Sequence, residues 1–181
     1  MTEKLKYAII GAGCMGQEHI LNIEIIDDAE VVALCDTSEK SIKESLDLLN
    51  NDVAIFDNYI DLVEANIADA FIIATPNFTH IEVLKEVMKS EAHLLIEKPL
   101  CTTIKDCQEF EKLALDYPGV IWTAMEYRYM PPVQRMIKEI HNKTIGDLKM
   151  LSIREHRFPF LHKVDDWNRF AIKTGGTLVE K

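Results

Sequence analysis

The chain has 181 residues, of which 48% are hydrophobic and 28% are charged, and its formal net charge is −10. This length provides one full domain and the start of a second. The acidic balance, with no block rich in lysine and arginine, argues against a nucleic-acid or anionic-membrane surface. No apolar stretch approaches the length of a membrane span, and the start MTEKLKYAIIG reaches its glycines too soon for a signal peptide.

The four cysteines show neither C-x-x-C spacing nor a secretory context. We interpret them as reduced thiols of a cytoplasmic protein, and neither as metal ligands nor as disulfides. No metal site is therefore expected. The cysteines are Cys14, Cys35, Cys101 and Cys107.

The first predicted element is an apolar strand over 5–10 that runs directly into G-x-G-x-x-G, and a helical pattern follows. In a dinucleotide site the first glycine makes the tight turn and the second lets the backbone approach a pyrophosphate. The third lets the helix pack closely on the strand, and the helix N-terminus faces the phosphates. The alternative is a glycine-rich surface turn. The residues predicted to contact a cofactor here are Gly11, Gly13, Cys14, Met15 and Gly16.

Asp36 ends the next apolar run, 30–35, about twenty residues past the third glycine, where a dinucleotide site has its acidic residue. A carboxylate there accepts hydrogen bonds from the adenosine ribose and repels a 2′-phosphate. No arginine follows in the next few residues, so NAD is favoured over NADP, although Lys40 weakens that preference. The alternative role of Asp36 is a helix N-cap, which Thr37 or Ser38 can also fill.

Short apolar runs continue to alternate with amphipathic stretches. Both sides of the strands are apolar, as expected where helices cover both faces of a parallel sheet. The pattern predicts an α/β fold with a doubly wound parallel sheet. Strands are expected over 5–10, 30–35, 53–56, 69–74, 92–96 and 120–124, and helices over 15–26, 38–49, 59–65, 79–90 and 103–116.

Ligands of such sheets bind beyond the carboxyl ends of the strands, so the residues that follow each strand are candidate site residues. Taken alone, the segment after 69–74 also fits a helix-capping turn, and the pair after 92–96 also fits an ion-paired strand end. The candidates at this edge are Thr75, Pro76, Asn77, His80, Glu97, Lys98 and Arg128.

Three motifs together resemble the Gfo/Idh/MocA family of NAD(P)-dependent oxidoreductases: the glycine turn, Ala74-Thr75-Pro76-Asn77-x-x-His80, and Glu97-Lys98-Pro99-Leu100. The resemblance implies a Rossmann domain over 1–125 and the start of an α+β substrate domain over 126–181. It places Lys98 beside the nicotinamide and the substrate's reacting oxygen, as a catalytic residue. It also implies that the Lys98–Pro99 peptide is cis, and that the full-length protein is a homo-oligomer.

The second half predicts a helix over 131–140 and a strand over 148–155. Asp166-Trp167-Asn168-Arg169, with Arg157 to Phe160 before it, suggests a sugar or polyol pocket, or else ordinary loop packing. The chain ends in Gly175-Gly176-Thr177-Leu178-Val179-Glu180-Lys181. By resemblance, Glu180 occupies a catalytic acid position, and the family's catalytic histidine follows four residues later. We therefore expect the N-terminal part of a longer enzyme that binds NAD but turns over poorly alone.

The expected reaction is hydride transfer between a nicotinamide cofactor and a secondary alcohol of a sugar, polyol or inositol. A charged Lys98 would stabilise the negative charge that builds on the reacting oxygen. Two other classes stay open. One is a non-catalytic NAD sensor or partner-binding module, and the other is an enzyme that uses NAD transiently for glycosidic cleavage, epimerisation or dehydration.

Overall fold

A computed structural model describes residues 3–156 and 162–176. Contacts within the chain divide it into two units. The first comprises Met1–Ala124 together with Val164–Lys181, and the second is Met125–Lys163.

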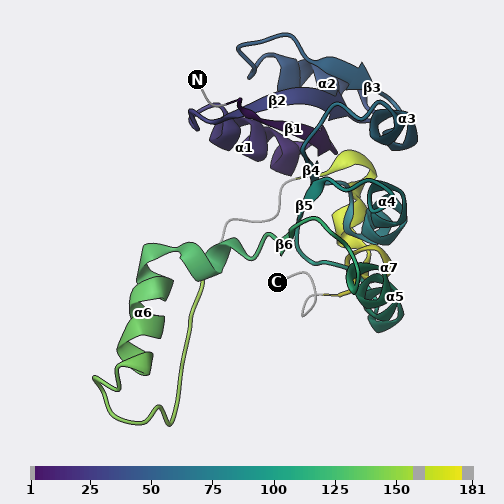
Figure 1. Ribbon diagram of the computed structural model, residues 1–181. Helices are drawn as coiled ribbons and strands as arrows, with labels where there is room; N and C mark the ends of the chain where they lie inside the picture. Colours follow the sequence, from purple (N-terminus) through teal and green to yellow (C-terminus); the bar gives the residue numbers. More distant parts are fainter. Residues whose placement is uncertain (1–2, 157–161, 177–181) are drawn as a thin grey trace. The chain divides into compact units, whose positions relative to one another are not determined.

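The first unit is built on one sheet of six parallel strands in the order β3-β2-β1-β4-β5-β6 (Figure 1). This order reverses at β1, which gives the doubly wound arrangement of a Rossmann fold. The predicted fold class is therefore confirmed, and all six predicted strands are present. Their bounds are β1 Leu5–Ile10, β2 Ala29–Cys35, β3 Ala54–Phe56, β4 Ala70–Ile73, β5 His93–Ile96 and β6 Ile121–Thr123.

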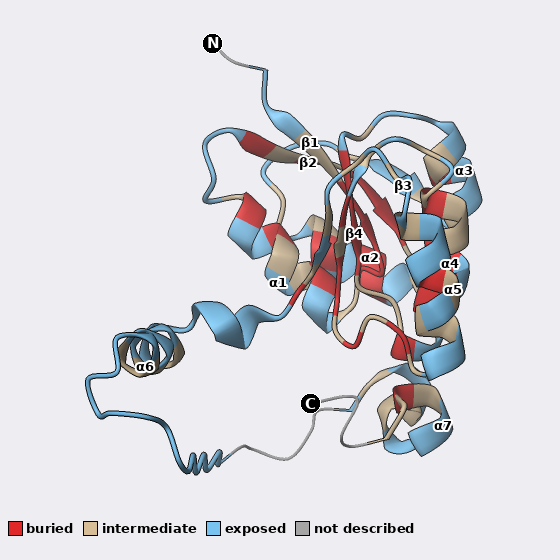
Figure 2. Ribbon diagram, turned by 60° about the horizontal axis from the view of Figure 1, so that its bottom comes forward, coloured by how far each residue is buried: buried red, intermediate tan, exposed pale blue. Residues whose placement is uncertain are grey.

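Helices cover both faces of the sheet, and the buried residues concentrate in the strands and on the helix sides that face them (Figure 2). One apolar cluster joins the sheet to α1 Cys14–Ile23 and α2 Glu39–Leu46. The other joins it to α3 Tyr59–Glu64, α4 His80–Val87 and α5 Ile104–Ala114. Burial on both faces explains why the strands lack polar alternation.

Side-chain caps set where several of these helices begin. The Ser38 hydroxyl accepts a hydrogen bond from the backbone of Ser41 at the start of α2. Asn58 caps α3 in the same way, and Thr103 caps α5. Because Ser38 fills the N-cap of α2, the carboxylate of Asp36 is left for another role.

The register of the sheet brings the ends of the strands to one edge. Ile10 pairs with Cys35 on one side and with Ile73 on the other. Ile73 in turn pairs with Ile96. The residues after each strand continue the pairing, since the backbone N–H of Gly11 bonds to Cys35 and that of Glu97 bonds to Ile73. The candidate residues of the first unit therefore follow strand ends that lie in line.

The second unit contains a 3₁₀ helix, η2 Glu126–Tyr129, and one long helix, α6 Pro131–His141, which confirms the predicted helix over 131–140. The predicted strand over 148–155 is wrong, because these residues have no regular structure. A strand needs a neighbour to accept its backbone hydrogen bonds, and the described part of this unit holds no second strand. Nowhere in residues 3–156 and 162–176 is a helix long and apolar enough to cross a membrane.

Candidate functional site

The glycine turn connects β1 to α1, and two of its glycines are required by the protein's own packing. Gly11 has φ +99°, and a Cβ there would lie 2.5 Å from the backbone carbon of Ala74. A Cβ on Gly16 would lie 2.1 Å from the carbonyl oxygen of Gly11. These contacts are far closer than atoms tolerate, so both positions exclude any side chain.

Gly13 differs, because nothing in the described structure lies within 4 Å of a Cβ built there. Its φ of −78° suits any residue, so neither strain nor packing explains the glycine. Gly13 also precedes the first turn of α1 without a side-chain cap, and the next residues, Cys14 and Met15, are exposed. A bare backbone and uncapped helix N–H groups beside open space fit the approach of a pyrophosphate.

Asp36 contacts the glycine turn directly. One carboxylate oxygen accepts a hydrogen bond from the backbone N–H of Ala12 at 2.8 Å, and the other accepts one from Ser38, also at 2.8 Å. The half-buried carboxylate thus links the end of β2 to the turn after β1. This is the place predicted for the acidic residue that binds the ribose.

The loop after β4 carries Thr75, Pro76 and Asn77 and leads through the 3₁₀ helix η1 Asn77–Thr79 into α4. The alternative of a capping turn is not supported, because α4 begins without a side-chain cap. Asn77 is 7% exposed, and its side-chain nitrogen has no hydrogen-bond partner in the described part of the chain. A buried amide without a partner is costly, so this donor fits contact with a ligand.

His80, fully buried, joins the loops after β4 and β5. Its Nδ1 lies 2.9 Å from the carbonyl oxygen of Pro99, and its Nε2 lies 3.0 Å from that of Thr75. Carbonyl oxygens only accept hydrogen bonds, and a neutral imidazole carries one N–H. A neutral ring therefore donates to one loop at a time, while a protonated ring donates to both.

Stability is expected to fall in acid because of His80. Burial, the largest effect, lowers the pKa of His80 below its ordinary 6.5, although the carbonyls of Thr75 and Pro99 oppose it. The unfolded chain then takes up a proton near pH 6.5 that the folded chain does not. The contribution of neutral His80 to the free energy of unfolding is thus complete above pH 6.5. It is lost as the pH falls toward the lower pKa of the folded state. Urea unfolding at about pH 7.5 and about pH 5.5 measures this loss.

The variant His80→Gln removes the titrating ring and is the matched comparison. We expect it to be less stable than the natural chain at both pH values, with a smaller difference between them. If the free energy of unfolding changed equally between the two pH values in both proteins, His80 would not be the cause of the loss of stability in acid.

Glu97 and Lys98 follow β5, and Glu97 contacts a histidine that the sequence motifs did not indicate. Nε2 of His19, on α1, lies 2.8 Å from one oxygen of Glu97, whose carboxylate is buried. The other oxygen accepts a hydrogen bond from the backbone N–H of Lys98 at 3.2 Å. Lys98 is half-buried, and the Lys98–Pro99 peptide is cis, as the resemblance implied. The position of His19, three residues after Gly16, is the sequence signal that could have identified it.

The described structure does not test the roles of two predicted site residues. Arg128 lies exposed on η2, in the second unit. Glu180 lies outside the described residues, as does the segment Arg157 to Phe160. Their roles remain predictions.

The polar–aromatic segment is partly described, as η3 Val164–Arg169, and the short helix α7 Ala171–Thr174 follows it. The ring of Trp167 meets that of Phe78, on η1, edge to face with centroids 6.4 Å apart. The ammonium group of Lys173 lies 5.4 Å from the centre of the Phe78 ring. Packing against the loop after β4 therefore accounts for Trp167.

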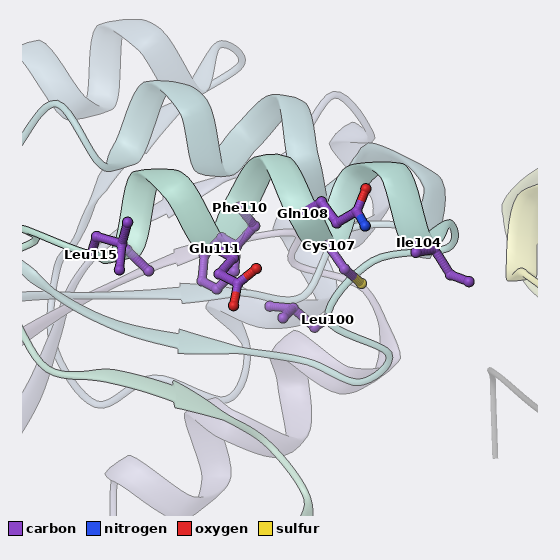
Figure 3. A pocket seen from close by; sticks show the side chains of 8 residues that line it. Leu100, Ile104, Cys107, Gln108, Phe110, Glu111 and Leu115 are labelled. Atoms are coloured by element: carbon purple, nitrogen blue, oxygen red, sulfur yellow. The ribbon is translucent and has the colours of Figure 1, made fainter.

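An open, mainly apolar groove lies elsewhere, along α5 (Figure 3). Leu100, Cys107 and Leu115 are among the residues that line it. It contains none of the predicted site residues. All four cysteines of the chain are free, and burial raises the pKa values of Cys35 and Cys101 to about 12.

The proteins to which this chain is similar include several dehydrogenases of about twice its length. Myo-inositol 2-dehydrogenase of Thermotoga maritima is 26% identical over 82% of this chain and 44% of its own. Inositol 2-dehydrogenase of Pseudarthrobacter chlorophenolicus is 30% identical over 88% and 47%. The WlbA dehydrogenase of Bordetella pertussis, solved with NADH and UDP-GlcNAcA, matches with a TM-score of 0.73 and 25% identity over 80% and 44%.

The chain thus spans just under half the length of the curated relatives it matches. A family model described as an oxidoreductase family with an NAD-binding Rossmann fold matches residues 5–124. That range holds the whole six-stranded sheet, the glycine turn and the loops after β4 and β5. The chain therefore belongs to the Gfo/Idh/MocA oxidoreductase family.

Proposed function

We propose that this chain binds NAD and is the cofactor-binding part of a dehydrogenase that oxidises a secondary alcohol of a sugar, polyol or inositol. The observation that carries the proposal is the contrast within the glycine turn. Packing requires Gly11 and Gly16, whereas Gly13 adjoins open space. Neither packing nor backbone conformation requires a glycine at position 13. A ligand that approaches the backbone closely is the best explanation for the absence of a side chain there. Two of the relatives above are inositol dehydrogenases, which supports the substrate class.

Each element at the sheet edge has a role in this proposal. The turn and the start of α1 hold the pyrophosphate, assisted by Cys14 and Met15, and Asp36 holds the adenosine ribose. The loop Thr75 to His80 borders the nicotinamide half, where the side-chain nitrogen of Asn77 supplies a donor. When bound, NAD supplies the hydride acceptor. Glu97 orients Lys98, and the roles of Arg128 and Glu180 belong to the same proposal.

Lys98 carries the chemistry assigned to the chain itself. As the alcohol loses hydride, its oxygen loses a proton and passes through a state with growing negative charge. An ammonium group that donates a hydrogen bond to that oxygen stabilises the transition state more than the ground state. The proton then passes to a base, which the resemblance to the family places after Glu180.

The wider organisation is also part of the proposal. We assign residues 1–125 to the cofactor domain and residues 126–181 to the start of an α+β substrate domain. Resemblance to the family supports this division, and it also supports a homo-oligomer. The four free thiols favour a cytoplasmic location.

The cofactor preference tests the proposal through Asp36. We expect the chain to bind NAD more tightly than NADP, because the carboxylate accepts from the ribose hydroxyls and repels a 2′-phosphate. Asp36→Asn should raise the Kd for NAD by roughly tenfold or more. It should also reduce the difference between the Kd values for NAD and NADP. Isothermal titration of both cofactors measures both effects.

Asp57→Asn is the matched control, because Asp57 is an exposed carboxylate just after β3, the strand next to β2. Its loss removes the same charge from the same sheet edge and should leave the preference unchanged. Natural chain that bound NADP as tightly as NAD would overturn the assignment of Asp36.

A further inference from the structure

We propose that Ser45, which no motif singles out, positions the glycine turn for the pyrophosphate. Ser45 lies near the end of α2 and is fully buried. Its hydroxyl donates a hydrogen bond to the carbonyl oxygen of Ala12 at 2.9 Å. This inference rests on the proposed function, because it concerns how the same turn is prepared for its ligand.

Side chains from three elements hold the two polar groups of Ala12, which is itself fully buried. Asp36, after β2, accepts from its N–H at 2.8 Å. Ser45, on α2, donates to its carbonyl, and the side chain of Gln17, on α1, also donates at 3.3 Å. Of the two donors to the carbonyl, Ser45 is closer and more buried, so its bond restrains the turn more strongly.

The direction of this bond matters for the next residue. The carbonyl of Ala12 and the N–H of Gly13 belong to one peptide unit, which is planar and trans. In such a unit the N–H points away from the carbonyl. A bond that holds the carbonyl toward α2 therefore aims the N–H of Gly13 away from α2. Gly13 is also the residue beside open space, where a pyrophosphate can approach.

A serine inside a helix has an ordinary alternative, which is to donate to the carbonyl one turn earlier in its own helix. Ser45 instead donates to a residue 33 positions away in the sequence. A turn that is already ordered loses less conformational freedom when the ligand binds. We therefore expect Ser45 to affect the binding of phosphates more than the stability of the fold.

The experiment compares Ser45→Ala with Ser41→Ala in the 181-residue chain. Ser41 is the matched control because it is a buried serine one turn earlier on the same helix. The side-chain hydrogen bonds to Ala12 in the described structure come from Asp36, Gln17 and Ser45, and not from Ser41. Alanine is the best helix former, so both variants should fold. The probes are ADP, which contains the pyrophosphate, and adenosine, which lacks it, titrated with NMR detection.

Ser45→Ala is expected to raise the Kd for ADP by about fivefold, the effect of one lost hydrogen bond, and to leave that for adenosine unchanged. Ser41→Ala should change neither. The role of Ser45 would be overturned if Ser45→Ala left the Kd for ADP unchanged, or if it raised the Kd for adenosine by the same factor as that for ADP. Either result would leave the proposed function intact. A natural chain that binds neither ADP nor NAD would instead overturn the proposed function, and this inference with it.

Discussion

Gly16→Ala is expected to destabilise the chain by about 2–3 kcal/mol or more and to abolish NAD binding. The added Cβ would lie 2.1 Å from the carbonyl oxygen of Gly11 and 3.3 Å from a methyl group of Ile9. The first neighbour is backbone, so it cannot move away by changing a rotamer. Relief of the clash must separate α1 from the turn and the strand before it. The usual gain from replacing glycine with alanine inside a helix, about 1 kcal/mol, is too small to compensate.

Gly13→Ala is the matched comparison, because it adds the same methyl group within the same turn. Its Cβ meets nothing within 4 Å, and its backbone suits alanine, so the free energy of unfolding should change by less than about 1 kcal/mol. Its affinity for NAD should nevertheless fall, because the methyl group occupies the space that the pyrophosphate needs. Urea unfolding and NAD titration of both variants separate the two effects. If Gly13→Ala bound NAD normally, the open space would not be the pyrophosphate site.

The sheet and the turn could be predicted because their signals are local and strong. Each strand is a short apolar run that ends at a turn, and burial on both faces removes any competing alternation. Gly11 and Gly16 could be assigned from spacing alone, since the turn geometry itself demands them. The place of Asp36 could also be predicted, because the end of the preceding strand fixes its position at the sheet edge.

The partners of residues that act through long-range contacts could not be predicted in this way, even where, as for His19, the position just after the glycine turn marks the residue itself as a candidate. His19 meets Glu97 across 78 positions of sequence, and Ser45 meets Ala12 across 33. Neither belongs to a motif, and each needs the packed helices before its partner is evident. The strand expected over 148–155 failed for the opposite reason. Its residues have a suitable composition, but a strand also needs a neighbour, which composition cannot supply.

Lys98→Met is expected to lower kcat for hydride transfer by about 10²- to 10³-fold, the loss typical of one donor to a developing oxyanion. Methionine keeps much of the length of the side chain and removes only the charge and the donor. The measurement is the rate of NADH formation from myo-inositol. The protein assayed contains these 181 residues and is as long as the relatives. Lys85→Met is the matched control, because Lys85 is a lysine of α4 that pairs with Glu82 and Glu109. It should leave kcat unchanged.

The distribution of the Lys98→Met effect between kcat and KM is the decisive result. Loss of a group that only binds substrate raises KM and leaves kcat unchanged. Loss of a group that stabilises charge in the transition state lowers kcat. The Kd for NAD should change little, because the glycine turn and Asp36 hold the far end of the cofactor. Unchanged kcat/KM in Lys98→Met would remove Lys98 from the chemistry. Turnover without net NADH would point to transient use of the cofactor, and NAD binding without any turnover would point to a sensor.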